Sequence, residues 1–203
     1  MADRDGSLHA GARTERKGDD VGVVNADDQS SSRSMGATGS APELVVVCGL
    51  PGVGKTTVAE TITDRTDGEL FRTDVVRKEL FPEPEYTAEE SQVVYEELFR
   101  RGTEALARGS AAVFDGTFTD RSRRENALAV ADEVGVDWTL VNVQCDTTVV
   151  ERRIECREND VSDADFDVHL MYRDRFEPID RDHVTVDNSD GLDETYRQIE
   201  TYF

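Results

Sequence analysis

Residues 49 to 57 read GLPGVGKTT, and this stretch decides the fold. Gly49, Gly54, Lys55 and Thr56 satisfy the spacing G-x-x-x-x-G-K-[ST], which is typical of a phosphate-binding loop. The flanking sequence supplies the expected context, because an apolar run precedes the loop and a helical pattern follows it. A chain of this length would match the string by chance about once in a hundred. The stretch therefore predicts a strand, a phosphate-binding loop and a helix in succession.

The chemistry of the loop predicts that it binds the triphosphate of ATP together with Mg²⁺. Glycines let successive backbone N–H groups face phosphate oxygens, and the following helix adds the positive end of its dipole. Lys55 is expected at the β and γ phosphates, the Thr56 hydroxyl on Mg²⁺ and Thr57 at the α phosphate. A glycine-rich turn with a solvated lysine is the alternative. The predicted ATP-binding residues are Gly49, Leu50, Pro51, Gly52, Val53, Gly54, Lys55, Thr56 and Thr57.

Beyond the loop, short β-rich runs alternate with longer amphipathic stretches, which is typical of an α/β protein with a parallel sheet. Strands are expected over residues 44–48, 70–73, 111–115, 138–144 and 183–186. Thr87 and Glu90 form a capping box ahead of one helix, and Gly135 ends another. The last segment has apolar residues at helical spacing and is expected to pack against the sheet.

The composition is strongly acidic, with 44 Asp and Glu against 23 Lys and Arg and a formal net charge of -21. The only lysines are Lys17, Lys55 and Lys78. Such a surface repels itself unless salt screens it, and the Debye length falls to about 3 Å at 1 M salt. We expect a halophilic source, with a merely acidic cytosolic protein as the alternative. The charge also argues against nucleic acid as a partner, because that requires clustered Lys and Arg.

Residues 1–41 are rich in Ser, Gly, Ala, Asp and Arg and have almost no apolar periodicity. They cannot bury enough surface to offset the entropy of ordering, so we expect a disordered tail there and one folded domain over residues 42–203. A mis-assigned start at Met35 is the alternative to a functional tail. The sequence shows no signal peptide and no apolar run near the roughly 20 residues that span a bilayer. A cytoplasmic protein without a membrane partner is expected.

Asp74 and Arg77 stand just beyond the second expected strand, in RTDVVRKEL. Ligands of open α/β sheets bind at the carboxyl ends of the strands, where a carboxylate can accept the proton of an attacking hydroxyl. Arg77 follows on the same helical face and is expected to hold a negative group of the acceptor. The alternative is that Asp74 only caps a short helix starting at Val75.

Two further features predict phosphoryl transfer. Asp115 ends an apolar run and is expected to hold Mg²⁺ or its waters; the alternative is a carboxylate that organises the following turn. Arg153 and Arg157 share a helical face ahead of the acidic segment ENDVSDADFD, residues 158–167, which is expected to be a mobile lid. Lid arginines stabilise charge on a transferring phosphoryl group, and pairing with nearby glutamates is the alternative. The expected catalytic residues are Lys55, Asp74, Arg153 and Arg157.

Other polar residues carry weaker signals. His169 and His183 lack partners at metal-ligand spacing and are expected to be structural. Arg121, Arg123 and Arg124 cluster at a helix start near the same edge of the sheet, where they either contact substrate or form a solvated face.

These motifs resemble the predicted AAA-domain kinase group of P-loop proteins, which is related to polynucleotide kinase domains, chloramphenicol phosphotransferase and gluconate kinase. The likeness rests on GLPGVGKTT, RTDVVRKEL, VFDGTF, RIECR, SDAD and FEP. It implies a three-layer, adenylate-kinase-like, doubly wound sheet with a lid, the second and third strands lying on one side of the first. It also implies that Asp74 is the acceptor base, Arg77 the acceptor-binding arginine, and Arg153 and Arg157 the lid arginines. Gly116 stands where Ala is commoner in the group.

The leading interpretation is an ATP-dependent kinase that transfers the γ-phosphoryl group to a hydroxyl of a small molecule. A 5'-hydroxyl polynucleotide kinase is the second, opposed by the acidity of the chain. A nucleotide-dependent switch without an acceptor is the third, but a guanine-specific switch needs an N-K-x-D-like base reader, and Asn188 in VDNSD lacks the lysine. The acceptor and the oligomeric state stay open, because a fold hosts many functions.

Overall fold

A parallel sheet lies at the centre of the fold in the computed structural model, which describes residues 43–156 and 165–203. Its five strands lie in the order β2-β3-β1-β4-β5. They are β1 (Glu43–Cys48), β2 (Glu69–Arg72), β3 (Ala112–Asp115), β4 (Asp137–Gln144) and β5 (Val184–Asp187). Each strand end lies within one residue of the range expected from the sequence. The predicted doubly wound sheet is confirmed, with β2 and β3 on one side of β1 and β4 and β5 on the other.

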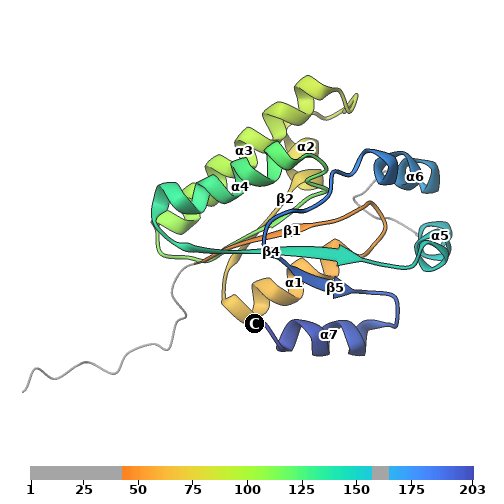
Figure 1. Cartoon of the computed structure of the whole chain (residues 1–203). Coiled ribbons are helices and arrows are strands. Elements are labelled where there is room, and N and C mark those ends of the chain that lie inside the picture. Colours follow the sequence, from red (N-terminus) through yellow and green to blue (C-terminus); the bar gives the residue numbers. More distant parts are fainter. Residues whose placement is uncertain (1–42, 157–164) are drawn as a thin grey trace, which may run out of the picture. The chain divides into compact units, whose positions relative to one another are not determined.

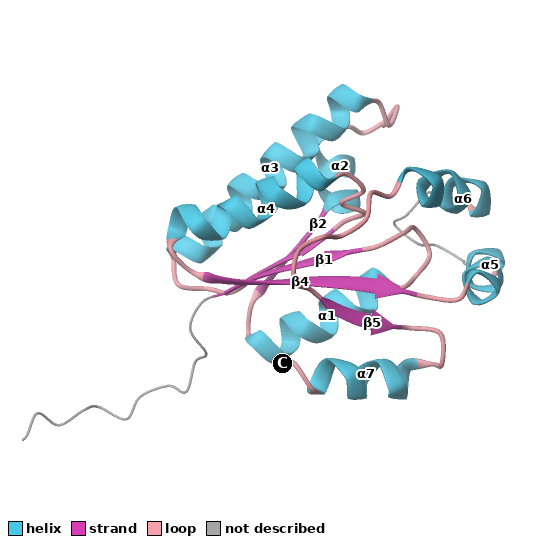
Figure 2. Cartoon of the chain, viewed as in Figure 1, coloured by secondary structure: helices cyan, strands magenta, loops and turns pink. Residues whose placement is uncertain are grey.

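Helices cover both faces of the sheet (Figures 1 and 2). Those in the described ranges are α1 (Lys55–Thr66), α2 (Thr73–Leu80), α3 (Ala88–Ala107), α4 (Arg121–Val134), α5 (Thr147–Glu155), α6 (Phe166–Arg175) and α7 (Leu192–Glu200). Helices α3 and α4 lie over one face, and α1 and α7 lie over the other (Figure 1). Helices α5 and α6 lie beyond the carboxyl ends of the strands, at the edge where open α/β sheets bind ligands.

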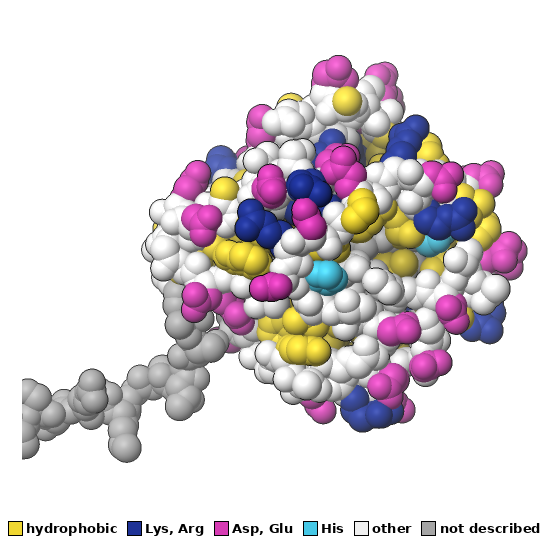
Figure 3. All heavy atoms as spheres, in the orientation of Figure 1, with side chains coloured by type: hydrophobic (Ala, Val, Ile, Leu, Met, Phe, Trp, Pro, Cys, Tyr) yellow, Lys and Arg dark blue, Asp and Glu magenta, His cyan; other side chains and the backbone are white. Residues whose placement is uncertain are grey.

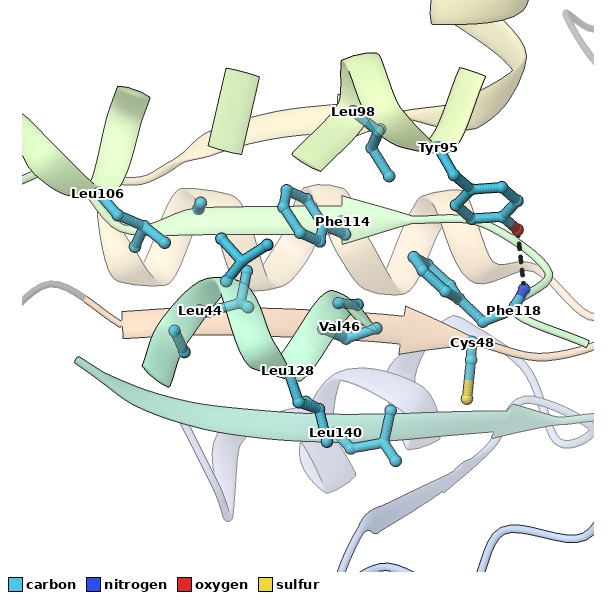
Figure 4. Close-up of a cluster of buried hydrophobic side chains, with 14 of the residues drawn as sticks. Leu44, Val46, Cys48, Tyr95, Leu98, Leu106, Phe114, Phe118, Leu128 and Leu140 are labelled. Atoms are coloured by element: carbon cyan, nitrogen blue, oxygen red, sulfur yellow. Dashed lines mark hydrogen bonds between the residues drawn. The ribbon is translucent and has the colours of Figure 1, made fainter. Parts of the chain in front are cut away.

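Two apolar cores follow from the alternation of side chains along β1. Leu44 belongs to the core beneath α3 and α4, whereas its neighbour Val45 belongs to the core that includes residues of α1 and α7. Figure 4 shows the first core, where the Tyr95 hydroxyl accepts a hydrogen bond of 3.2 Å from the backbone N–H of Phe118. Both faces of β1 are therefore buried, which explains why this strand reads as a continuous apolar run.

One close contact fixes α3 against β3. Gly102 lies inside α3, where glycine costs about 1 kcal/mol of helix stability relative to alanine. A Cβ at this position would lie 2.2 Å from the Phe114 ring. The glycine therefore lets the helix pack directly on the strand that ends in Asp115.

The N-termini of α3 and α2 test two capping residues considered in the sequence. The Thr87 hydroxyl accepts a hydrogen bond of 3.2 Å from the Glu90 N–H, so the predicted cap of α3 is confirmed. Helix α2 begins at Thr73, however, and its N-cap is Arg72. The alternative that Asp74 only caps a helix starting at Val75 is therefore excluded, because Asp74 lies inside the first turn of α2.

The structure describes only the end of the segment expected to be a lid. Its last three residues, Asp165 to Asp167, form the cap and first turn of α6, and the Asp165 carboxylate accepts a hydrogen bond of 2.9 Å from the Val168 N–H. The remainder of the predicted lid, residues 158–164, lies outside the described residues, as do Arg157 and the predicted tail. In the part of the chain that is described, no helix has the length and apolarity needed to cross a bilayer.

The C-terminal segment packs against the sheet as expected, with two of the four apolar side chains at helical spacing, Ile199 and Phe203, in contact with the core. Ile199 is fully buried in the second core, and Phe203 packs against it. Leu192 and Tyr196 stay 49% and 37% exposed. The buried face of α7 instead includes the hydroxyl of Thr195, which contacts the loop after β5.

Candidate active site

The phosphate-binding loop leaves β1 and turns sharply into α1. Gly49 and Gly54 adopt φ angles of 146° and 91°, which side chains with a Cβ rarely adopt. A Cβ on Gly49 would also lie 2.4 Å from the Val143 carbonyl oxygen. Gly54 is the N-cap of α1, so the loop ends at the positive end of a helix dipole. This backbone suits an anion, as the motif predicts.

Asn188, in the loop after β5, holds the second half of the phosphate loop. Its side-chain amide donates a hydrogen bond of 2.8 Å to the Val53 carbonyl, and its carbonyl accepts one of 2.8 Å from the Thr195 hydroxyl. Asn188 is 2% exposed, so these bonds form away from water. The sequence gives Asn188 no role of this kind, because the contact joins residues 135 positions apart.

Helices α5 and α6 hold the first half of the loop. The His169 ring nitrogen Nδ1 lies 2.7 Å from the Pro51 carbonyl oxygen, and His169 is 1% exposed. Gly52 packs so closely on α5 that a Cβ there would lie 2.7 Å from Val150 and 2.9 Å from Ile154. His169 therefore has the structural role expected for it, since its ring connects α6 to the phosphate loop.

The first turn of α1 carries the two side chains predicted to contact the phosphates and the metal. The Lys55 ammonium donates a hydrogen bond of 2.9 Å to the Leu50 carbonyl and so folds back over the loop. The Thr56 hydroxyl donates one of 2.8 Å to the Asp115 carboxylate at the end of β3. Lys55, Thr56 and Asp115 all line the same cavity. The structure thus brings Asp115 to the first turn of α1, although it lies 59 positions from Thr56 in the sequence.

Arg72, at the end of β2, contacts both Thr56 and Asp115, and no motif in the sequence had indicated this role. Its Nη2 donates a hydrogen bond of 3.1 Å to the Thr56 hydroxyl, and its Nε lies 3.4 Å from the Asp115 carboxylate. The adjacent hydroxyl and carboxylate oxygens are the hard donors that Mg²⁺ prefers, so Thr56 and Asp115 fit the predicted metal. No group of three or more His, Cys, Asp or Glu at metal-binding distance occurs within residues 43–156 and 165–203. A metal here would therefore complete its shell with water and phosphate oxygens.

A cavity of about 610 Å³ connects the phosphate loop to the predicted acceptor side. The residues on the acceptor side come from α2, α3 and α6 and include Asp74, Arg77, Tyr95 and Tyr172. A second depression of about 430 Å³ lies between α3 and α4 and contacts neither the loop nor Asp74. The larger cavity is therefore the candidate site.

The environment of Asp74 favours its neutral form. Burial raises the pKa of the Asp74 carboxyl and Asp115 adds to the rise, whereas Lys55, Arg72 and Arg77 lower it, with a net upward shift. A carboxylate with a raised pKa is a stronger base than an ordinary aspartate once it is ionised. Perturbed carboxyl groups inside a cavity are typical of catalytic sites.

Arg77 lines the cavity, but its guanidinium is already engaged. Its Nη1 lies 3.2 Å from the Glu90 carboxylate, its Nη2 donates a hydrogen bond of 3.0 Å to Ser91, and the group stacks 4.9 Å above the Tyr86 ring. Arg77 is 8% exposed. Its assignment as an acceptor-binding residue stays a prediction, and its contacts also show that it fastens α2 to α3.

Arg153, the described member of the predicted lid pair, lies beside the phosphate loop. Its Nη1 lies 3.5 Å from the Cys145 sulfur and 3.7 Å from where a Cβ of Gly54 would be. It reaches the loop from α5, so its predicted role at the phosphates is compatible with its position. Arg157 lies outside the described residues, and its role stays a prediction.

The three arginines at the start of α4 separate into different environments. Arg123 lines the cavity and stacks 4.8 Å above the Tyr95 ring. Arg124 is buried and donates to the carbonyls of Phe118 at 2.7 Å and Glu177 at 3.0 Å, so it holds the FEP segment in place. Arg121 is exposed and does not line the cavity. Only one of the three is therefore placed to meet a substrate.

Helix α6 supplies cavity residues that the sequence analysis does not single out. Val168, Met171, Tyr172 and Arg175 all line the cavity, and their spacing of three, four and seven residues places them on one helical face. Apolar and charged residues alternate irregularly around α6, so no amphipathic stripe predicts it. The cap at Asp165 is the one local signal for this helix.

Charge is spread widely over the surface around this site. Figure 3 shows Asp and Glu side chains scattered across the visible face, with fewer Lys and Arg between them. The long-range field of the protein is therefore negative, as its net charge of -21 requires. An anionic ligand depends on local cations to offset that field.

Comparison with known proteins gives the family. A family model described as AAA domain matches residues 44–179, which include the phosphate loop, Asp74, Asp115 and α6. The chain belongs to this family. Uncharacterized protein Rv2004c of Mycobacterium tuberculosis (strain ATCC 25618 / H37Rv) is 30% identical to this chain over 135 residues, or 60% of this chain. The chain spans 27% of the length of that relative, and the same figures hold for Uncharacterized protein Mb2027c of Mycobacterium bovis.

Solved structures of kinases share the fold at low sequence identity. A sugar kinase from Janibacter sp. HTCC2649 has a TM-score of 0.61 at 16% identity, covering 80% of this chain and 94% of that one. A gluconokinase from Sinorhizobium meliloti 1021 has 0.60 at 20%, covering 78% and 89%. The APS kinase CysC of Mycobacterium tuberculosis, in complex with AMPPNP and APS, has 0.61 at 15%, covering 79% and 96%. The fold is that of the P-loop kinases, which confirms the group that the motifs resemble.

Proposed function

We propose that the protein is an ATP-dependent kinase that transfers the γ-phosphoryl group to a hydroxyl of a small-molecule acceptor. The observation that carries this proposal is the single cavity shared by the phosphate loop and Asp74. A binding module or a switch has no need of a half-buried carboxylate in the same cavity as the phosphate loop. The kinase titles of the neighbouring structures, which name a sugar kinase, a gluconokinase and an APS kinase, give further support.

In the proposed reaction, Asp74 is the general base. Its ionised carboxylate accepts the proton of the acceptor hydroxyl while the hydroxyl oxygen forms a bond to the γ phosphorus. The bond between the γ phosphorus and the oxygen that bridges to the β phosphate breaks at the same time. The products are ADP and the phosphorylated acceptor, and Asp74 then releases its proton.

The other residues hold the reactants and offset charge. The loop N–H groups and Lys55 bind the phosphates, and Arg153 stands next to the loop where a second cation meets the transferring group. Thr56 and Asp115 would hold Mg²⁺, which supplies a positive charge on the β and γ phosphates when bound. Arg72 orients both of these donors through its contacts with them.

A transfer assay with γ-labelled ATP tests the proposal. The full chain is incubated with Mg²⁺ and with sugars, sugar acids, nucleosides, aminoglycosides and 5'-hydroxyl oligonucleotides, and labelled products are separated from ATP. We expect labelling of a small molecule, its loss in Asp74→Asn, and normal labelling in Asp132→Asn, an exposed carboxylate on α4. Labelling of oligonucleotide ends alone would refute the proposal. It would also be refuted if Asp74→Asn turned over ATP at the wild-type rate with every acceptor tested.

A further inference from the structure

Helix α6 presents two different faces to the site. Phe166 and His169 stack with parallel rings 5.7 Å apart, and His169 contacts the phosphate loop, so this face is anchored. The other face, defined above by its spacing, lines the cavity with Val168, Met171 and Tyr172 and ends in Arg175. The contact between His169 and Pro51 therefore positions the cavity-lining face of α6.

The arginines of the cavity differ in whether a carboxylate neutralises them. Three of them are paired: Arg72 with Asp115 at 3.4 Å, Arg77 with Glu90 at 3.2 Å and Arg123 with Asp120 at 3.2 Å. Arg175 also lines the cavity, but within residues 43–156 and 165–203 it forms no ion pair and no hydrogen bond. Among the described residues, therefore, no carboxylate neutralises its guanidinium and none of its donors is engaged.

The position of α6 places this cation on the acceptor side of the cavity. Burial raises the pKa of Tyr95 and Tyr172 adds to the rise, so the two tyrosines are neighbours. Tyr95 belongs to α3, which packs on the helix that carries Asp74. Lys55 and Arg153, which we propose for the nucleotide phosphates, lie at the loop. Tyr172 and Arg175 are one helical turn apart. Arg175 thus lines the cavity one helical turn beyond Tyr172, the neighbour of Tyr95 on α3.

Resting on the kinase function proposed above, we propose that the acceptor is a hydroxyl compound that itself carries an anionic group, a carboxylate or a phosphate, and that Arg175 binds this group. Met171 and Tyr172 contact its carbon skeleton. An unpaired arginine favours such a group through charge-assisted, bidentate hydrogen bonds. The protein is otherwise strongly acidic, so without such a cation its field would repel an anionic acceptor.

Equilibrium binding to the nucleotide-loaded protein tests this without requiring transfer. The full chain is saturated with AMPPNP and Mg²⁺, and calorimetry measures the binding of matched probes: gluconate and glucose, glycerol 3-phosphate and glycerol, adenosine 5'-monophosphate and adenosine. At least one anionic probe is expected to bind about tenfold or more tightly than its neutral partner. Arg175→Gln should remove that advantage, and Arg175→Lys should retain part of it.

The matched control is Arg173→Gln, because Arg173 is exposed on the same helix, lies 3.7 Å from Asp174 and does not line the cavity. It should leave probe binding unchanged. Equal binding of anionic and neutral probes would overturn the inference, and so would an Arg175→Gln variant that loses AMPPNP affinity instead, which would assign Arg175 to the nucleotide. A loaded protein that binds an anionic probe through Arg175 but transfers nothing would uphold the anion site and refute the kinase function.

Discussion

The hydroxyl of Thr56 donates a 2.8 Å hydrogen bond to the carboxylate of Asp115, which joins the first turn of α1 to the carboxyl end of β3. Two features of the sequence are thereby placed in contact: the last residue of the phosphate-loop motif's core and the acidic end of an apolar strand. This hydrogen bond braces the sheet edge, and the same two side chains would hold the proposed Mg²⁺. Changes at either residue should therefore affect both metal use and stability.

Asp115→Asn should raise the Mg²⁺ concentration needed for half-maximal activity and destabilise the fold. The amide cannot supply the negative charge that Mg²⁺ and Arg72 require, and the mostly buried Arg72 is left unpaired. We expect a loss of about 1–3 kcal/mol in the free energy of unfolding. Urea titrations and activity measured across Mg²⁺ concentrations check both effects, with Asp132→Asn as the control. An unchanged Mg²⁺ requirement would remove Asp115 from the metal site.

Asp74→Asn should abolish transfer and yet stabilise the protein. The raised pKa means that the folded state binds this proton more tightly than the unfolded chain, whose ordinary value is 3.8. The free energy of unfolding therefore falls as pH rises from 3.8 through the raised pKa, and the penalty is complete above it. The asparagine variant lacks this penalty, so its melting temperature at neutral pH should exceed that of the wild type. A less stable variant would contradict this account of the carboxyl group.

The rate should depend on pH for the same reason. Transfer requires an ionised Asp74, so kcat should decline on the acid side with a midpoint above 3.8, the ordinary value for Asp. A pH–rate profile measured in wild type and in Arg77→Lys supplies the check. A midpoint at or below the ordinary value would exclude a desolvated base.

Gly116→Ala should be destabilising here even though alanine is commoner at this position in the group that the motifs resemble. A Cβ at residue 116 would lie 2.8 Å from the Thr73 methyl group, so the first turn of α2, and Asp74 with it, must move. Overpacking of this kind costs about 1–3 kcal/mol. Thr73→Ser removes that methyl group and should restore most of the stability and activity in the double variant. If Gly116→Ala were as stable as the wild type, α2 would be able to shift away from the new methyl group at no cost in stability.

Asn188→Ala should weaken nucleotide binding from a distance. The substitution leaves the Val53 carbonyl without its buried donor, at a cost of about 1–3 kcal/mol, and the Thr195 hydroxyl keeps only the Gly191 carbonyl as acceptor. The loop then loses one of its supports, so KM for ATP should rise more than kcat falls. Asn126→Ala, an exposed asparagine on α4, is the control. If kcat alone responded, Asn188 would act on the chemistry and not on the loop.

Stability should rise with salt. A net charge of -21 produces self-repulsion that salt screens, so the melting temperature should increase between dilute buffer and molar KCl. Thermal unfolding across that range, with sucrose as a non-ionic control, measures the effect. Maximum stability in dilute buffer would count against the predicted halophilic origin.

The loop and the strands could be predicted because their signals are local, whereas the order of the strands was implied by the family resemblance. The apolar run ahead of Gly49 predicts a strand by composition alone, and parallel strands must be joined by crossover helices. Lys55, Thr56, Asp74 and Asp115 then share an edge by topology. None of these inferences requires knowledge of a distant side-chain contact.

What escaped prediction depends on contacts between distant residues. Arg72 looks like an ordinary strand residue until Thr56 and Asp115 are placed beside it. Asn188 and His169 act on backbone carbonyls of the loop, which carry no sequence signal of their own. Asp74 has the residue type of a helix cap, but the helix starts earlier because the chain turns at Arg72.

Three separate parts of the fold contact the phosphate loop: α6 at Pro51, α5 at Gly52 and the loop after β5 at Val53. Its shape is therefore acquired when the chain folds, and the nucleotide meets a receptor that is already preorganised. The entropy of ordering the loop is then lost during folding, which leaves more of the phosphate contacts to appear as affinity. Nucleotide affinity should therefore report on the integrity of the surrounding fold. Local loosening of α5, α6 or the end of β5 would weaken binding of the triphosphate before the sheet unfolds.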